Sequence, residues 1–271
     1  MKSFLPIALA LCSLSSTASA ETLTFGIVPQ QSPLKMFKAW KPITQYLSEQ
    51  TGHKIVFKTE KSIAEFERVL YRGGYDLAYI NPYHFIVANR KQNYQAAVRA
   101  KKMIRGILVA KGRDTDFDSM IKSKTTQYLF PSPNAFAATL LTKFELLSKF
   151  GVDVNQQNAH QYVNSHDSVY SGIARNTGQL GGGIQRTYDN FNKQKDKQKL
   201  NVIYTTDAYP SHPIAYKASI PIDIQQKLTN ALMTIPEELI EVLNIKKIIR
   251  SSNKEYNSIR RLETSLATIK R

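Results

Sequence analysis

Cysteine is almost absent from this chain, since Cys12 is the only one in 271 residues. A protein with a single cysteine forms no internal disulfide and offers no thiolate cluster to a metal, so core packing has to stabilise the fold. Long apolar runs are also missing after the first twenty residues. No later stretch has the roughly 18 apolar residues that a membrane-spanning helix needs.

Acidic residues are scarce relative to basic ones. The chain has 21 Asp and Glu against 37 Lys and Arg, which gives a formal net charge of +16. An excess of this size attracts anions in general, including small anionic ligands, nucleic acid and acidic lipid head groups.

Sequence signatures of catalysis are lacking as well. There is no nucleophile elbow, no phosphate loop ending in Gly-Lys-Ser/Thr and no paired-histidine zinc motif. The five histidines are scattered, and only His160 and His166 are close in sequence. Asp167 follows His166, but no serine has the context of a nucleophile. We therefore expect a protein that is not an enzyme and that has no cofactor and no metal site.

The first twenty residues have the pattern of a cleavable secretory signal peptide. Lys2 provides the positive start, residues 4–14 form an apolar core, and Ala18-Ser19-Ala20 is a small-residue cleavage box. Leu11 precedes Cys12, whereas lipoprotein cleavage sites have a small residue there. We expect export, cleavage after Ala20 and a mature chain of charge +15, because Lys2 is lost with the leader. Export makes nucleic acid an unsuitable partner.

Strand-like and helix-like segments alternate behind the leader. Short apolar runs bounded by turn residues predict strands, and amphipathic runs predict helices. We expect strands at 23–28, 54–58, 75–80, 95–100 and 104–110, and helices at 34–50, 62–71 and 82–90. This order predicts a mainly parallel sheet with helices on both faces.

The alternation starts again after a polar break at residues 112–116. We expect strands at 127–130, 160–163, 179–184 and 200–204, and helices at 133–150 and 165–175. The segment after residue 205 offers one strand, at 214–216, and helices beginning near residues 221, 236 and 253. We expect it to complete the first sheet.

The predicted fold is therefore an α/β fold with two lobes, each a mainly parallel sheet flanked by helices. Lobe 1 would contain residues 21–112 plus 207–271, and lobe 2 residues 113–206. Crossings near residues 112–114 and 209–210 would act as hinges that close the cleft between the lobes on a ligand.

The junction at Asn81-Pro82 is the most informative stretch. Asn is a good helix N-cap and Pro fits the first helical position, so a helix should begin directly after the strand at 75–80. Ligands bind open α/β sheets at such carboxyl ends of strands. Ser32-Pro33 and Ser132-Pro133 follow two other predicted strands in the same way. We therefore expect three helix N-termini to converge on one cleft.

Two features of the chain have two interpretations each. Tyr79 and Tyr83 flank Asn81 and would either line the cleft or pack in the core. The run Gly181-Gly182-Gly183 would either let backbone amides approach a phosphate or let a strand end pack tightly against a helix.

Six segments, taken in order, carry a family resemblance. They are residues 25–29 (FGIVP), 75–79 (YDLAY) with Pro82, 107–109 (ILV), Pro133-Asn134, 165–169 (SHDSV) and 178–180 (GQL). In this order and spacing the chain resembles the substrate-binding proteins of phosphate, phosphite and phosphonate ABC transporters. The resemblance implies a two-lobed periplasmic binding protein of the type II class, which closes on a small anion and presents it to a membrane ABC permease. We expect it to be a monomer.

The resemblance also implies site residues and shows departures from them. His166 matches the binding histidine of the family. Phosphonate binders typically continue Pro-Asn with Ser-Thr-Ser-Gly, whose hydroxyls and amides hold phosphonate oxygens, whereas residues 135–138 are Ala-Phe-Ala-Ala here. Gly181 stands where an acidic residue is usual. Arg186 is close to the glycine run and suits an anion contact, because arginine recognises planar and tetrahedral anions well.

The predicted ligand site consists of Tyr79, Asn81, Tyr83, Asn134, Ala135, Phe136, His166 and Arg186. The missing hydroxyls and the missing acid predict poor binding of aminoethylphosphonate, and they favour an anion with some apolar character. The alternative function is a periplasmic ligand-sensing subunit for a membrane sensor kinase, which would need the same hinge and the same cleft.

Overall fold

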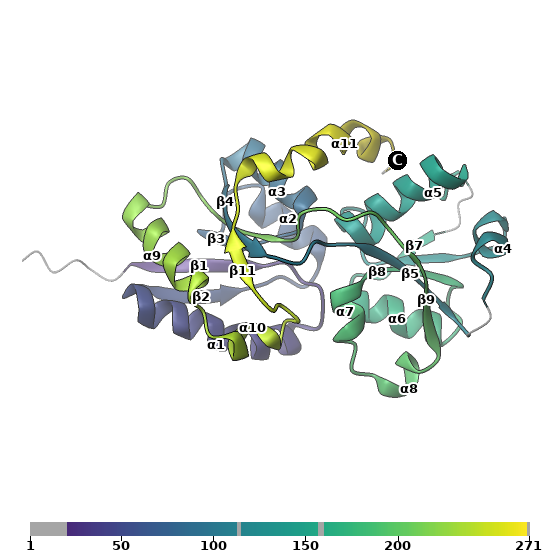
Figure 1. Ribbon diagram of the computed structural model, residues 1–271, viewed down its shortest axis with the longest axis horizontal. Helices are drawn as coiled ribbons and strands as arrows, with labels where there is room; N and C mark the ends of the chain where they lie inside the picture. Colours follow the sequence, from purple (N-terminus) through teal and green to yellow (C-terminus); the bar gives the residue numbers. More distant parts are fainter. Residues whose placement is uncertain (1–20, 113–114, 157–159, 270–271) are drawn as a thin grey trace, which may run out of the picture.

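The computed structural model describes residues 21–112, 115–156 and 160–269, so the predicted leader lies outside the described residues. The chain forms two sheets in two adjoining parts of the molecule (Figure 1). Among the described residues, no helix combines the length and the apolar character that crossing a membrane requires.

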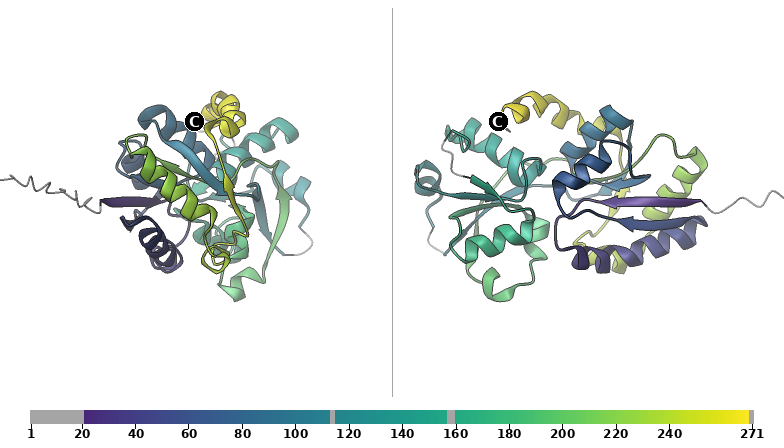
Figure 2. Two further views of the ribbon diagram at one scale, coloured as in Figure 1. Left: turned by 60° about the vertical axis from the view of Figure 1, so that its left-hand side comes forward. Right: turned by 180° about the vertical axis from the view of Figure 1, so that it is seen from behind.

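The first sheet has six strands in the order β11-β4-β10-β3-β1-β2. Their bounds are β1 (Thr22–Ile27), β2 (Lys54–Lys58), β3 (Leu77–Tyr79), β4 (Gln95–Ala100), β10 (Pro213–Tyr216) and β11 (Ile248–Arg250). β1 pairs in parallel with β2 and β3, while β10 runs antiparallel to both of its neighbours. Helices cover both faces (Figure 2). They are α1 (Pro33–Thr51), α9 (Ile222–Met233) and α10 (Glu237–Glu241) on one side, and α2 (Ile63–Leu70), α3 (Pro82–Gln92) and α11 (Asn257–Ile269) on the other.

The second sheet has five strands in the order β7-β6-β8-β5-β9. Their bounds are β5 (Gly106–Lys111), β6 (Tyr128–Phe130), β7 (His160–Tyr162), β8 (Leu180–Ile184) and β9 (Leu200–Thr205). β6 pairs in parallel with β7 and β8, and β5 is reversed. The π-helix η1 (Phe136–Leu141) and the α-helix α5 (Thr142–Phe150) pack on one face and α6 (His166–Ala174) on the other. Three shorter helices complete this part, namely α4 (Phe117–Lys122), α7 (Gln185–Asp189) and α8 (Gln194–Lys197).

Two extended segments, residues 101–105 and 206–212, connect the sheets and run side by side (Figure 1). Their backbones pair at Ile104 and Tyr209, whose N–H groups donate to each other's carbonyl oxygens over 2.8 and 3.0 Å. A third connection is α11, which follows the 3₁₀ turn η2 (Asn253–Tyr256) and reaches from the first part to contact α5.

The strand near 104–110 was assigned to the wrong sheet. It was expected in lobe 1, but β5 pairs with β8 and β9 of the second sheet. An apolar run predicts a buried strand without saying which sheet the strand joins. The polar break at 112–116, of which residues 113–114 lie outside the described ranges, belongs to the connection from β5 to α4. We therefore propose a lobe boundary near residue 104, whereas the boundary near 207 stays a prediction.

Two other expectations also differ from the structure. The segment after residue 205 supplies two strands to the first sheet, because β11 follows β10. The helix expected from Pro133 begins at Phe136 instead, after Ala135 in an extended conformation. Pro133 and Asn134 lie in the preceding turn, where contacts with the first part of the molecule hold Asn134. Such long-range contacts are invisible to a local helix-start pattern.

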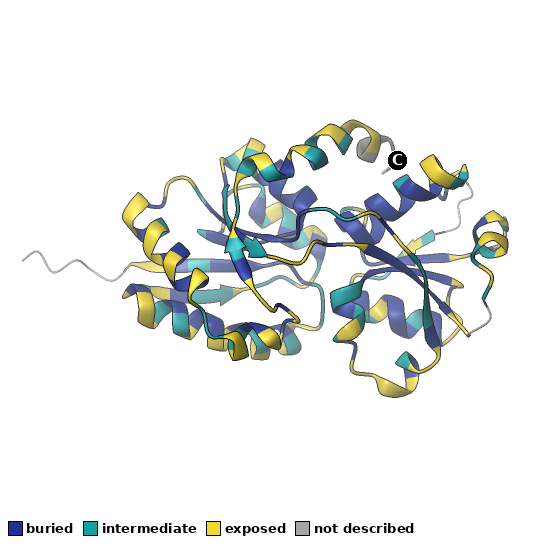
Figure 3. Ribbon diagram, in the orientation of Figure 1, coloured by how far each residue is buried: buried dark blue, intermediate teal, exposed yellow. Residues whose placement is uncertain are grey.

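The glycine run supports close packing of helices on both faces of β8. A Cβ atom on Gly182 would lie 2.2 Å from the carbonyl oxygen of Ala138 in η1, and one on Gly181 would lie 2.7 Å from side-chain carbons of Val169 and Ile173 in α6. The structure thus supports the packing interpretation of this run. Figure 3 shows the result, with buried segments concentrated where η1, α3 and the two sheets meet.

Candidate functional site

A small cavity lies between the two parts of the molecule. Its volume is about 20 Å³, which is enough for at least one water molecule. We call it the amide cavity. Its lining includes Gln30 and Asn81 from the first part, Ala135 to Ala138 and His166 from the second, and His212 from a crossing.

The first residues of η1 form one wall of the amide cavity. The first amides of a helix have no partner inside it, and the first bonds of η1 are those from Thr139 and Leu140 to the Ala135 carbonyl. Phe136, Ala137 and Ala138 are each no more than 2% exposed, so bulk solvent does not reach their amides. η1 continues directly into α5, and the positive end of this helix favours an anion in the cavity.

His166 forms a second wall at the start of α6. Ser165 caps this helix, because its side chain accepts a hydrogen bond from the Ser168 N–H. The His166 ring is buried, and its Nδ1 atom has no partner among the described residues. Burial, and then the positive charge of Arg186, lower the pKa of His166 to about 3. The ring is therefore neutral near pH 7, with one N–H donor and one acceptor nitrogen.

Gln30, in the loop after β1, links the elements around the cavity. Its Oε1 accepts a hydrogen bond from Arg186 over 2.7 Å, and its Nε2 lies 3.0 Å from Nε2 of His212. An amide NH₂ group only donates, so Nε2 of His212 is the acceptor and its ring is neutral. Burial, and then the charge of Arg186, hold the pKa of His212 well below its ordinary value. The backbone carbonyl of Gln30 also accepts from the His166 N–H over 3.2 Å.

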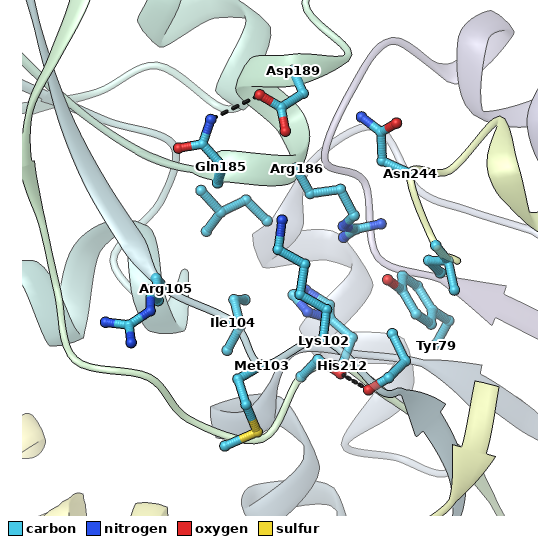
Figure 4. A pocket seen from close by; sticks show the side chains of 14 residues that line it. Tyr79, Lys102, Met103, Ile104, Arg105, Gln185, Arg186, Asp189, His212 and Asn244 are labelled. Carbon is cyan, nitrogen blue, oxygen red and sulfur yellow. Dashed lines mark hydrogen bonds between the residues drawn. The ribbon is translucent and has the colours of Figure 1, made fainter. Parts of the chain in front are cut away.

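Arg186 and Tyr79 face a neighbouring pocket of about 60 Å³ (Figure 4). The Arg186 guanidinium carbon lies 5.5 Å from the centre of the Tyr79 ring, and Tyr79 stacks on His212 with the ring centres 5.2 Å apart. We call this the hinge pocket, because residues 102–105 and 211–212 of the two crossings line it. Ile104, Ile184 and His212 line both cavities.

Asn81 and Asn134 connect the two parts of the molecule. Asn81 caps α3 by accepting from the His84 N–H over 2.8 Å, and its Nδ2 donates to the Asn134 carbonyl over 3.0 Å. Asn134 Nδ2 donates to a carboxylate oxygen of Glu67 over 2.8 Å. We call Glu67, Asn81 and Asn134 the clasp. It holds the loop before η1 against the first part of the molecule.

The structure divides the eight predicted site residues into three groups. Four of them line the amide cavity, two line the hinge pocket, and two line neither. In that order they are Asn81, Ala135, Phe136 and His166; Tyr79 and Arg186; and Tyr83 and Asn134.

Tyr83 and Asn134 do not line either cavity, so their role in ligand binding stays a prediction. Tyr83 is buried, at 6% exposure. The Asn134 side chain belongs to the clasp. Both positions flank the site in sequence, and only the packing of distant elements decides where their side chains point.

The helix starts and the position of Gly181 need correction. The N-termini of α3 and η1 meet at the amide cavity as expected. The third N-terminus at this cavity is that of α6 instead of α1. Ser32 and Pro33 line a separate groove, which residues of both parts of the molecule border. A side chain at position 181 would point into the packing against α6, so an acid there would not reach the cavity.

Two residues around the cavity were missed, Gln30 and His212. Gln30 follows Pro29 at the carboxyl end of β1, which is the position that the strand-end argument favours. His212 lies in the predicted crossing beside Pro213. The position of each residue in the chain could therefore have indicated it, although neither belongs to a motif.

Comparisons with known proteins bear on the family of this chain. A family model described as "ABC transporter, phosphonate, periplasmic substrate-binding protein" matches residues 25–256. The phosphate-import protein PhnD of Mycolicibacterium smegmatis is 21% identical over 239 residues, which cover 79% of this chain and 72% of that protein.

Solved structures show the same fold. A binding protein component of an ABC phosphonate transporter from Pseudomonas aeruginosa superposes with a TM-score of 0.83 and 16% identity, covering 92% of this chain and 88% of that one. PhnD1 from Prochlorococcus marinus in complex with methylphosphonate gives 0.82 and 15%, covering 92% and 99%. These likenesses confirm the predicted two-lobed type II fold.

Proposed function

The chain belongs to the periplasmic substrate-binding proteins of phosphonate ABC transporters, and from this premise we propose that it captures a small tetrahedral oxyanion in the amide cavity. One observation carries the proposal. The buried residues Phe136, Ala137 and Ala138 line a cavity, and their N–H groups precede the first hydrogen bonds of η1. Buried donors without partners are costly, at about 1–3 kcal/mol each, and an oxyanion would satisfy them.

The remaining groups suit the same ligand. Neutral His166 offers one N–H donor, and its Nδ1 atom has no other partner among the described residues. Arg186 lies beyond Gln30 and contributes positive charge without entering the amide cavity. A hydrogen bond to a charged group contributes about 1.5–3 kcal/mol, so the amides and His166 together account for a tight complex without the hydroxyls that residues 135–138 lack.

Capture requires the two parts of the molecule to move apart and close again. Residues 136–138 and His166 line the amide cavity and are each no more than 3% exposed, so bulk solvent has little access to them in this arrangement. The ligand therefore enters an open form. Because both parts contribute cavity walls, a bound oxyanion favours the closed form over the open one.

The partner follows from the family. We propose that the closed form docks on an ABC permease, that the protein acts as a monomer without catalytic turnover, and that export removes residues 1–20. Intact mass from a Gram-negative host should match a chain that starts at Glu21. The sensing alternative stays a prediction, because no contact in the structure favours it over transport; neighbouring genes for a permease and an ATPase, or for a histidine kinase, would separate the two.

Calorimetric titration with methylphosphonate, phosphate and phosphite tests the proposed function. We expect at least one of them to bind with one-to-one stoichiometry, and His166→Ala to weaken binding about tenfold or more, because the variant removes a buried hydrogen-bond partner. Ser168→Ala is the matched control, since Ser168 lies in the same helical turn but is exposed. No binding by the wild type, or undiminished binding by His166→Ala, would contradict the proposal.

A further inference from the structure

The hinge pocket is positively charged and its cations are not neutralised. Lys102, Arg105 and Arg186 line it together with a single acid, Asp189. Asp189 accepts a hydrogen bond from Gln185 over 2.7 Å, and Arg105 donates to the Thr206 carbonyl over 2.8 Å. An excess of positive charge in a partly enclosed pocket attracts anions.

Lys102 is the most available of these cations. Its side chain lies within the pocket, and its ammonium points toward the segment that carries Gln185 and Arg186 (Figure 4). Among the described residues it has no hydrogen-bond or ion-pair partner. Arg186 donates to the neutral Oε1 atom of Gln30, and no carboxylate in the described part of the chain forms an ion pair with it. Two cations thus face one pocket without a carboxylate on either.

The hinge pocket adjoins the amide cavity. Ile104, Ile184 and His212 line both. If the oxyanion end of a ligand binds the η1 amides, the rest of the ligand can therefore lie along these three residues. Two of the three wall residues are aliphatic, and the hinge pocket continues with apolar Met103 and Ile245. The path from one cavity to the other therefore suits a short hydrocarbon chain with an anionic end.

We propose that the ligand is a phosphonate with a second acidic group, and that this group lies beside Lys102 and Arg186 in the hinge pocket. The inference rests on the proposed function and adds the chemistry of the substituent. It also gives a physical reason for poor binding of aminoethylphosphonate, because the ammonium of that compound would enter a pocket of like charge. This reason replaces the one based on Gly181.

A matched pair of ligands tests the inference. Propylphosphonate and 3-phosphonopropionate have the same chain length but end in a methyl group and a carboxylate, respectively. For the wild type we expect calorimetry to show about fivefold tighter binding of 3-phosphonopropionate, as for a partly exposed ion pair. Lys102→Gln should reduce this ratio toward one, and added salt should reduce it in the wild type.

Lys101→Gln is the control variant, because Lys101 is exposed like Lys102 but does not line the pocket. It should keep the wild-type ratio. Equal or weaker binding of 3-phosphonopropionate, or a ratio that Lys102→Gln leaves unchanged, would overturn the inference. If methylphosphonate binds while both longer ligands do not, the inference fails and the proposed function stands. If methylphosphonate, phosphate and phosphite also fail to bind, both fail.

Discussion

Single residues around the amide cavity combine burial with neutrality. His166 and His212 are 3% and 4% exposed, and both lie near the positive charge of Arg186, so each ring stays uncharged in the folded protein. A neutral ring avoids the cost of burying a second cation beside Arg186. It still offers one N–H to an anionic ligand.

The low pKa of His166 predicts how stability depends on pH. The folded value is about 3 and the ordinary value 6.5, so between these limits the unfolded chain binds more protons than the folded one. The free energy of unfolding should be unaffected by this residue above pH 6.5. It should fall below that pH, by about 1.4 kcal/mol per pH unit for one histidine.

Two measurements check this prediction. Denaturant unfolding between pH 8 and 4 should give a smaller pH slope for His166→Gln than for the wild type. The ring proton signals of His166 in the folded protein should stay constant over the same range in NMR spectra. A titration midpoint near pH 6.5 in the folded state would show that the ring is not held neutral.

At this scale the sequence predicts some site residues and not others. Ala135, Phe136 and His166 could be found because they follow strand ends and match a family order. Gln30 and His212 act through hydrogen bonds to residues more than 150 positions away, and no local pattern records such bonds. For the same reason the sequence does not show that the Asn134 side chain belongs to the clasp.

Among the elements, β8 and η1 determine the shape of the amide cavity. Gly182 lets the first turn of η1 approach the sheet, and Gly181 does the same for α6 on the opposite face. Ala135 provides no capping side chain for η1. The position of its buried start therefore depends on Gly182 of β8, which has no side chain and lets η1 come close.

Two alanine substitutions distinguish the role of Gly182 in shaping the amide cavity from a general effect on packing. Gly182→Ala should lower stability by about 1–3 kcal/mol through overpacking, and it should also weaken oxyanion binding, because its Cβ would displace the Ala138 carbonyl. Gly181→Ala should lower stability by a similar amount, because its Cβ would meet Val169 and Ile173, and it should leave affinity close to the wild-type value. Thermal unfolding and calorimetry with methylphosphonate would show this. Equal affinities for the two variants would contradict the assigned role of Gly182.

Most elements were predictable because each has a local cause. Asn81-Pro82 and Ser165 begin helices where their capping chemistry places them. Pro133 failed as a helix start, since the clasp fixes the backbone there from outside. The π-helical geometry of η1 has no signal in its sequence that we can identify.

At the scale of the whole molecule, hydrogen bonds join the two parts around the amide cavity. The clasp joins the two parts on one side of the cavity, and Gln30 joins them through Arg186 and His166. In this arrangement the amides of residues 136–138 are buried, and no described residue accepts a hydrogen bond from them; a buried donor without a partner costs about 1–3 kcal/mol. A bound oxyanion would satisfy these groups and would therefore shift the equilibrium toward the closed form.

This balance predicts a change of shape on binding. In small-angle X-ray scattering, saturating methylphosphonate should lower the radius of gyration of the wild type. Asn134→Ala should require more ligand for the same change, because the hydrogen bond from the Asn134 side chain to Glu67 is lost. A scattering curve that ligand leaves unaltered would count against closure about the two crossings.

The two-lobed architecture followed from the repeated strand and helix alternation, and the comparisons confirm it. The strand at 104–110 joins the second sheet instead of the first, because the chain crosses between the two parts before β5 begins. Which sheet a buried strand joins depends on its partners, and here those are the glycine strand β8 and β9.

The central claim is that the first amides of η1 hold an oxyanion. The most direct measurement is a titration of ¹⁵N-labelled protein with methylphosphonate, or with phosphate if that binds more tightly, followed by the amide signals of residues 136–138. The account predicts large downfield proton shifts at these amides and slower exchange of their protons with solvent. Saturable binding that leaves those three amide signals unmoved would place the ligand elsewhere and contradict the account.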